Sequence, residues 1–422
     1  MVNNKTLRVA INAQVSKGGA AGGVEQFIIG LVSSLGRLGD GPEEYLLIVR
    51  RGNRDWLKPY LGANQHTVLG PSSKFEAMKQ FLEPFRFTAG NLLARAQSLI
   101  QRFPSVRIPV SNGFFESLGV DIVHFPYQRF VRSSIPSVYN PHDLQHIHYP
   151  EFFSRSEIAF RELIYRAGCN DAEAVAMPSH WARKDVARQY AIAPQKIFAV
   201  LYGAPTELYE TITPSVLKNV TSRFRLPQVF ALYPAQTWEH KNHIRLLEAL
   251  ALLRDRDHLA VNLVCTGRKN DFWRVIERRI CELRLENQVR FLGYVTATEL
   301  RAIYHAAQFV IFPSLFEGGG LPVLESFHES VPVACSNVTA LPEYAGDAAL
   351  LFHPFSIESI ADVLRRMTTD ADLRETLRQR GSARIRLFTW ERTAKTYRAL
   401  YRQVARAPLS DEDRALLTDS VG

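Results

Sequence analysis

The stretch "QFVIFPSLFEGGGLPVLESFHES" (308–330) decides which fold we expect. Its first seven residues form a short apolar run that is typical of a buried strand. From residue 321 onward the apolar residues recur at helical spacing, and Pro322 stands near the helix start, where a missing N–H costs nothing. The three glycines at 318–320 therefore lie where a strand passes into a helix. Free N–H groups at such a junction, at the positive end of the helix dipole, attract an anion.

Two carboxylates flank these glycines. Glu317 and Glu325 are separated by a little over two helical turns, so both can face one pocket if the loop curls back. Beside an anion site, they suit a phosphate-bearing ligand whose hydroxyl groups need carboxylate acceptors. A plain turn followed by an exposed helical glutamate is the simpler alternative, and the strand and helix on either side weigh against it.

The bulk properties describe a soluble globular chain. Its 422 residues are enough for about two or three domains, and the hydrophobic fraction of 46% is ordinary. No apolar stretch approaches the length that crosses a bilayer, and the four cysteines are too scattered for a zinc site or a disulfide framework. We therefore expect a cytoplasmic protein. The net charge of +9 lies mostly in residues 1–205, which suggests an anionic partner such as a membrane surface, a phosphorylated lipid or nucleic acid.

Short apolar runs alternate with helix-like stretches along the whole chain. This alternation predicts parallel sheets covered by helices on both faces, which is an α/β fold. The runs are 7–13, 45–50, 121–126, 137–143, 174–179 and 197–204, then 229–236, 261–267, 289–293, 308–314, 332–336 and 349–354. Two such domains facing each other would create one cleft, with ligands beyond the carboxyl ends of the strands.

The predicted boundaries follow breaks in this alternation. We expect an N-terminal domain over 1–205, which contains a variable helical segment at 71–118. A linker follows over 206–227, and three prolines lie in the stretch 205–227. A second domain follows over 228–382. The last long helix is expected over 383–406, where it can cross back to the first domain, and 407–422 is expected to be a disordered tail.

Four motifs in a fixed order resemble a known family. They are "GGVEQF" (22–27), "NPHDLQHIHYPEFFS" (140–154), "LYPAQTWEHKNH" (232–243) and "FPSLFEGGGLPVLESFHESVPVACSNVTALPEYAGDAALLFHP" (312–354). The chain resembles the family 4 retaining glycosyltransferases, whose GT-B architecture has two Rossmann-like domains facing across a cleft. The resemblance covers most of the chain except 71–118 and the tail. It looks closest to bacterial mannosyl- and rhamnosyltransferases of polysaccharide assembly, including lipopolysaccharide.

The resemblance implies transfer of a sugar from a nucleoside diphosphate to an acceptor hydroxyl, with the anomeric configuration kept. The leaving diphosphate gains negative charge, which must be stabilised in place. By the resemblance, Lys241 stabilises that negative charge, and Glu317 holds the hydroxyls of the donor sugar or sits near its anomeric carbon. His142 lies against the sugar and the leaving phosphate, and Asp143 orients the loop or His142.

Other positions are implied as donor contacts. Glu325 accepts hydrogen bonds from the ribose, and Tyr294, in "GYV" (293–295), lies against the nucleobase. The family usually has an arginine where this chain has Gln236, so either Arg268 or an amide donor takes its place. Backbone N–H groups complete the expected donor site at Gly22, Gly23, Gly318, Gly319, Gly320 and Leu321. Asn242 is expected to cap its helix.

We expect no metal and no cofactor. The D-x-D pair Asp255–Asp257 ends a polar helix on what we take to be a solvated face, and His146 and His148 are interpreted as loop packing. Lys241 and the helix dipole would replace the divalent ion of metal-dependent transferases. With no obvious carboxylate nucleophile, we favour front-face attack, in which the leaving phosphate takes the proton of the acceptor.

The expected partners are a nucleotide sugar, with GDP-mannose as the first choice, and a glycan or lipid-linked glycan. The alternatives are a sugar-nucleotide epimerase, a phosphorylase, or a non-enzymatic protein that binds anionic surfaces; no nucleic-acid motif is present. The segment 73–104 carries an apolar stripe with five basic residues against two glutamates. It is either core packing or a surface that rests on the inner face of the cell membrane.

Overall fold

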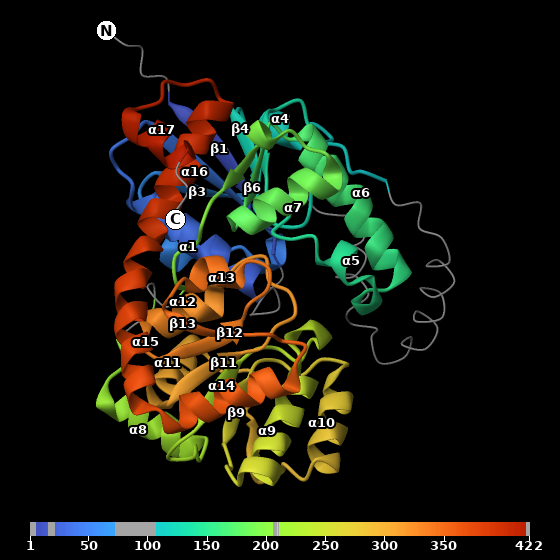
Figure 1. Cartoon of the computed structure of the whole chain (residues 1–422). Coiled ribbons are helices and arrows are strands. Elements are labelled where there is room, and N and C mark those ends of the chain that lie inside the picture. The colour runs from blue at the N-terminus through green and yellow to red at the C-terminus, as the bar shows by residue number, and fades with distance from the viewer. Residues whose placement is uncertain (1–5, 16–21, 72–106, 206–208, 210, 419–422) are drawn as a thin grey trace, which may run out of the picture. The chain divides into compact units, whose positions relative to one another are not determined.

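The computed structural model describes residues 6–15, 22–71, 107–205, 209 and 211–418 (Figure 1). Contacts divide the chain into two compact units. Unit 1 holds 1–141, 153–176 and 398–417, and unit 2 holds 142–152, 177–397 and 418–422. The expected segment 73–104 lies outside the described residues.

The first sheet has seven strands in the order β3-β2-β1-β4-β5-β6-β7. The strands are β1 (Leu7–Asn12), β2 (Glu43–Val49), β3 (Gln65–Leu69), β4 (Ile122–Phe125), β5 (Ser137–Tyr139), β6 (Ala174–Met177) and β7 (Ile197–Ala199). The helices between them are α1 (Gly23–Arg37), α4 (Phe114–Ser117), α5 (Gln145–His148), α6 (Arg155–Asp171) and α7 (His180–Tyr190).

The second sheet has six strands in the order β10-β9-β8-β11-β12-β13. The strands are β8 (Ala231–Pro234), β9 (Leu263–Thr266), β10 (Val289–Phe291), β11 (Phe309–Phe312), β12 (Val333–Ser336) and β13 (Ala349–Phe352). The helices are α8 (Pro214–Arg223), α9 (His243–Asp257), α10 (Trp273–Glu282), α11 (Ala297–Ala306), α12 (Leu321–His328), α13 (Leu341–Ala345), α14 (Ile357–Thr369), α15 (Ala371–Arg384), α16 (Trp390–Val404) and α17 (Asp411–Thr418). In both sheets the strand pairs that the register defines are parallel, so the predicted α/β fold with two Rossmann-like sheets is confirmed.

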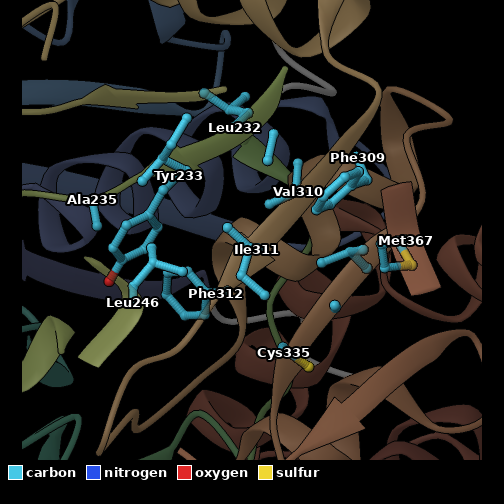
Figure 2. Packing of buried hydrophobic residues seen from close by; sticks show 14 of the residues in the cluster. Leu232, Tyr233, Ala235, Leu246, Phe309, Val310, Ile311, Phe312, Cys335 and Met367 are labelled. Carbon is cyan, nitrogen blue, oxygen red and sulfur yellow. The ribbon is translucent and has the colours of Figure 1, made fainter. Parts of the chain in front are cut away.

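The core of unit 2 explains why its strands read as uninterrupted apolar runs. Every residue of β11 is buried, and Val310, Ile311 and Phe312 pack with Leu232 and Tyr233 of β8 (Figure 2). Parallel strands covered on both faces have no solvent face and need no polar alternation. Helices α9 and α14 pack together over this sheet, as do α8 and α11 (Figure 1).

The contacts do not divide the chain at the predicted boundaries of 1–205 and 228–382. Residues 142–152 and 177–205 group with unit 2 because they contact its loops. Ser179 Oγ donates to Gly318 O at 2.9 Å, and Tyr344 Oη donates to Pro178 O at 2.5 Å. The predicted linker 206–227 contains helix α8, which begins at Pro214 after the N-cap Thr213.

The predicted helix over 383–406 was wrong in its extent. Helix α15 continues to Arg384, a short 3-10 turn follows over Ile385–Leu387, and α16 begins at Trp390. The break comes at Thr389, whose Oγ1 accepts from Arg392 N at 3.2 Å and so starts a new helix. Residues 398–417 belong to unit 1, where Tyr401 Oη lies 2.8 Å from His124 Nδ1.

The prediction of a disordered tail over 407–422 was wrong for residues 411–418, which form α17. Ser410 Oγ accepts from Asp413 N at 3.0 Å, and Asp413 accepts from Ser410 N at 2.9 Å. Asp413 also receives a hydrogen bond from Arg402 Nη1 at 2.9 Å. A reciprocal cap and a buried ion pair therefore order this segment.

Candidate functional site

The candidate site lies at the point in the second sheet where the strand order reverses. Strands β8 and β11 are neighbours there, and both are parallel, so their carboxyl ends meet at one edge. The loop after β8 leads through a 3-10 turn over Glu239–Lys241 to α9, and the loop after β11 leads to α12. Open parallel sheets bind ligands outside such a switch point because the two loops diverge and leave a crevice.

Lys241 and Glu317 come together across these two loops. The Nζ of Lys241 lies 2.6 Å from the Oε1 of Glu317, and the side chains are 17% and 15% exposed. Tyr233 donates its hydroxyl to Lys241 O, and the Lys241 ammonium lies 5.3 Å from the centroid of Phe312. Thr339 Oγ1 accepts from Glu317 N at 3.0 Å. The pair is thus held from both strands, with one cation and one anion partly exposed at the sheet edge.

The same two loops are tied together by Asn242. It is the N-cap residue of α9, as expected, but its side chain makes no capping hydrogen bond to the helix backbone. Asn242 has a left-handed backbone (φ 61°), and its Nδ2 donates to Pro313 O at 3.0 Å and Pro354 O at 2.8 Å. The buried amide satisfies two carbonyls that would otherwise be orphaned, which outweighs a cap that solvent can replace.

The loop at 318–320 consists of glycines because neighbouring groups leave no room for a Cβ at two of its positions. A Cβ at Gly318 would lie 2.5 Å from His142 O, and one at Gly320 would lie 2.6 Å from Tyr344 Cγ. Gly319 is different, since its nearest neighbour would be Pro178 Cβ at 3.4 Å. Helix α12 starts directly after Gly320, and no side chain caps its first N–H groups.

His142 lies on the loop that covers these glycines. Its backbone is left-handed (φ 68°), its side chain is almost fully buried, and its Nδ1 lies 2.9 Å from Tyr202 Oη. Asp143 Oδ1 accepts from Gln145 N at 3.0 Å, so this carboxylate stabilises the turn that carries His142. Of the two roles expected for Asp143, the contact seen is the one with the loop.

Glu325 projects from the second turn of α12. Tyr304 Oη donates to Glu325 Oε2 at 2.7 Å. Burial, and to a smaller extent the neighbouring charge of Glu329, raises the pKa of Glu325 to about 7 against the lowering effect of the tyrosine hydrogen bond. This carboxyl therefore titrates near neutral pH, which is typical of a group in a functional site.

Three other residues that were expected to contact the nucleotide sugar lie on the loops after β8, β9 and β10. Gln236 Oε1 accepts from Trp238 Nε1 at 3.1 Å, and the Arg268 guanidinium lies 5.2 Å from the ring centroid of Tyr294. Tyr294 is 59% exposed, so its ring is open to stacking. Thr237 N donates to Arg268 O at 3.2 Å, which holds the first two loops together.

Gly22 and Gly23 belong to unit 1, at the start of α1. Gly22 has a positive φ of 53° and precedes the first helical residue, with no side-chain cap. This is the strand-to-helix junction expected from "GGVEQF". Their part in the same donor site stays a prediction, as does the cleft between the two halves.

Sequence reasoning missed the residues that hold the site in place. Tyr202, Thr339 and Tyr304 each donate or accept at a predicted site residue, and Ser179 binds the glycine loop. No local motif marks them, because each acts over a long separation along the chain.

Within the described residues, no group of three or more His, Cys, Asp and Glu side chains could hold a metal ion. Asp255 and Asp257 instead pair with Arg254 and Arg256 at 2.7 and 2.6 Å. Among the helices of the described ranges, none is both long and apolar enough to span a bilayer.

Comparison with solved structures defines the class of fold. The chain superimposes on a sucrose-phosphate synthase from Thermosynechococcus elongatus with a TM-score of 0.66, at 19% identity over 95% of this chain and 100% of that one. WaaG, a glycosyltransferase involved in lipopolysaccharide biosynthesis, gives a TM-score of 0.60 at 17% identity over 98% of this chain and 100% of that one. The fold is that of the GT-B glycosyltransferases.

Sequence comparison then identifies the family. Residues 220–384 match the model of the family described as "Glycosyl transferases group 1". The chain is 30% identical to O-antigen chain mannosyltransferase B of Escherichia coli over 59% of this chain and 66% of the relative. It is 24% identical to O-antigen chain mannosyltransferase RfbU of Salmonella typhimurium over 50% of this chain and 55% of that one. The matched stretch thus spans about two thirds or less of these relatives. The chain belongs to the group 1 glycosyl transferases, and the predicted family is confirmed.

Proposed function

We propose that the chain is a retaining glycosyltransferase that moves a hexose from a nucleoside diphosphate to a hydroxyl of a glycan or lipid-linked glycan. The sugar is proposed to be mannose and the donor GDP-mannose, because relatives are named as mannosyltransferases of O-antigen chains. The observation that carries the proposal is the Lys241–Glu317 pair beside the uncapped start of α12, at the switch point of the second sheet.

The chemistry assigns one role to each charge of this pair. In the proposed reaction the bond between the anomeric carbon and the diphosphate oxygen breaks, and negative charge gathers on the leaving group. Lys241 and the N–H groups at 318–321 stabilise that charge. Glu317 holds the sugar hydroxyls or faces the positive charge that develops at the anomeric carbon.

The acceptor is proposed to attack from the face that the diphosphate leaves, so the configuration is retained. The acceptor hydroxyl oxygen bonds to the anomeric carbon, and its proton passes to the departing phosphate oxygen. His142 is proposed to lie against the sugar and that phosphate, with Tyr202 fixing its ring through Nδ1. No metal is required in this scheme, because Lys241 and the helix dipole provide the positive charge.

The remaining donor contacts are proposed from the neighbouring loops. Glu325 accepts from the ribose hydroxyls, and the exposed ring of Tyr294 stacks on the nucleobase with Arg268 beside it. For a lipid-linked acceptor, the enzyme would act in the cytoplasm at the inner face of the cell membrane. The excess of positive charge in residues 1–205 supports that placement.

A nucleotide-release screen tests the proposal. The full chain is incubated with GDP-mannose, UDP-glucose, UDP-GlcNAc or dTDP-rhamnose, with and without a preparation of lipid-linked glycan. We expect release of GDP that depends on the acceptor, and NMR of the product should show the anomeric configuration of the donor. Conversion of a donor without any acceptor would indicate an epimerase, and a requirement for inorganic phosphate would indicate a phosphorylase.

A further inference from the structure

A cavity of about 610 Å³ lies in unit 2, at the opposite edge of the sheet from the candidate donor site. Gln308 and Pro332 line it, and these residues directly precede β11 and β12. The cavity is therefore at the amino ends of the two strands whose carboxyl ends lead to Glu317 and to α13. Its volume falls in the range of sites that hold small organic ligands.

One wall of the cavity is a neutralised ion pair. Arg301 Nε donates to Glu329 Oε1 at 2.8 Å and Nη2 donates to Oε2 at 3.3 Å. Burial acts in the opposite direction, but hydrogen bonds from His305, His328 and Arg301 hold the pKa of Glu329 well below its usual range. The one deeply buried carboxylate in the wall thus has its charge matched, and it does not repel an anion as an isolated charge would.

Residues of α15 also line the cavity. Ala371, Arg374, Glu375 and Arg378 follow each other at helical spacing and all line the cavity. Arg378 pairs with Glu375 at 2.7 Å, so that these two charges also cancel. Among the charged lining residues, three arginines face two glutamates, which leaves a positive excess before the histidines are counted.

Arg374 carries that excess. Its Nη1 donates to Met367 O at 2.9 Å and Thr368 O at 3.0 Å, the carbonyls at the end of α14, which fix the guanidinium in place. Within the described parts of the chain, its Nε and Nη2 have no hydrogen-bond partner. His305 and His328 each use one ring nitrogen on Glu329, and their other nitrogens have no partner in those same parts.

We propose that this cavity binds a small phosphate-bearing molecule, held by Arg374 with His305 and His328. A guanidinium with two N–H groups in one plane matches two phosphate oxygens. A flanking histidine donates to a third oxygen as an imidazolium, because its other ring N–H already donates to Glu329. The volume exceeds that of a free phosphate, so the ligand is an ester or a diphosphate. This site is separate from the proposed donor site and does not depend on the transferase assignment.

Calorimetric titration with inorganic pyrophosphate at low ionic strength tests the site. The parent is the full chain with Lys241→Gln, which removes the cation of the proposed donor site. We expect Arg374→Gln/Arg378→Gln to weaken pyrophosphate binding at least tenfold. The control Arg380→Gln/Arg386→Gln removes the same charge from residues that do not line the cavity, and it should bind within twofold of the parent.

A cavity-filling variant and a vesicle sedimentation measurement complete the test. Ala371→Trp fills the cavity without changing charge and should cause the same loss, which covers the case that the arginine variant unfolds. Equal binding by the cavity and control variants, or no binding by the parent at millimolar pyrophosphate, would overturn the proposal. Sedimentation with phosphatidylglycerol vesicles that is lost only in the cavity variants, without pyrophosphate binding, would assign the site to a lipid headgroup and reject the small molecule.

Discussion

The Nζ of Lys241 lies 2.6 Å from the Oε1 of Glu317, although the two residues are 76 positions apart in the chain. Each follows a strand at the switch point of the second sheet, so the topology brings them together. A partly buried ion pair at this position can exchange partners: when a diphosphate arrives, the lysine can turn to it and release the carboxylate to the sugar.

Replacing Lys241 with alanine should lower turnover by on the order of a hundredfold or more, as the loss of a group that stabilises a leaving anion typically does. The measurement is steady-state nucleotide release with the donor found in the screen.

Glu317→Gln keeps the shape of the partner and removes its charge, and it should reduce turnover while leaving Lys241 in place. Activity of the wild type should not change in EDTA; activity lost in EDTA and restored by manganese would contradict the metal-free scheme.

Replacing Glu325 with alanine should raise the donor dissociation constant about ten- to a hundredfold. The reason is the loss of charge-assisted hydrogen bonds to ribose hydroxyls, which contribute roughly 1.5–3 kcal/mol. Calorimetric titration with the nucleoside diphosphate measures this directly. Glu358→Ala, an exposed glutamate on α14, is the matched control, and unchanged binding in Glu325→Ala would remove Glu325 from the donor site.

Donor affinity should increase as the pH rises through about 7. The pKa of Glu325 is raised to about 7 in the folded chain, so the carboxylate that accepts from ribose forms only above that pH. Glu325→Gln should flatten the pH dependence of binding between pH 6 and 8. A wild-type affinity that is constant over this interval would contradict the assignment.

The same raised pKa predicts the sign of a stability effect. Between the ordinary value of 4.5 and about 7, the folded chain binds more protons at Glu325 than the unfolded chain does. The contribution of Glu325 to the free energy of unfolding therefore falls as pH rises through that window. Comparing the pH dependence of the melting temperature in wild type and Glu325→Gln isolates this contribution.

Replacing His142 with alanine should damage transfer while leaving nucleoside diphosphate binding nearly intact, because its proposed contacts are with the sugar and the leaving phosphate. Tyr202→Phe removes only the hydroxyl 2.9 Å from His142 Nδ1 and should give a smaller loss of turnover. Equal loss of binding and transfer in His142→Ala would mark this residue as structural.

Alanine at Gly318 should destabilise the fold and reduce activity, whereas alanine at Gly319 should be tolerated. The added Cβ would meet the backbone oxygen of His142 at 2.5 Å in the first case and only Pro178 Cβ at 3.4 Å in the second. Overpacking of this kind typically costs about 1–3 kcal/mol. Thermal unfolding of the two variants provides the comparison, and similar melting temperatures would show that the His142 loop does not pack on Gly318 as described.

The sequence by itself determined the α/β fold and the strand-to-helix junction at 308–330, because their signals are local. The apolar run at 308–314 and the helical spacing after Pro322 correspond to β11 and α12. Glycines between a strand and a helix are a short-range pattern, and so is the lysine that follows β8. The capping pattern of Ser410 and Asp413 is also local, but it was not recognised in the sequence, and α17 was missed.

Only the tertiary structure decided what holds these residues in place. Gly318 must lack a side chain because a loop from far earlier in the chain packs against it, and the side-chain amide of Asn242 donates to two distant carbonyls. Tyr304 and Tyr202 support Glu325 and His142 over separations of 21 and 60 residues. Local pattern reports which conformation a segment prefers. It carries no information about which distant group will lie within hydrogen-bond distance once the chain has folded.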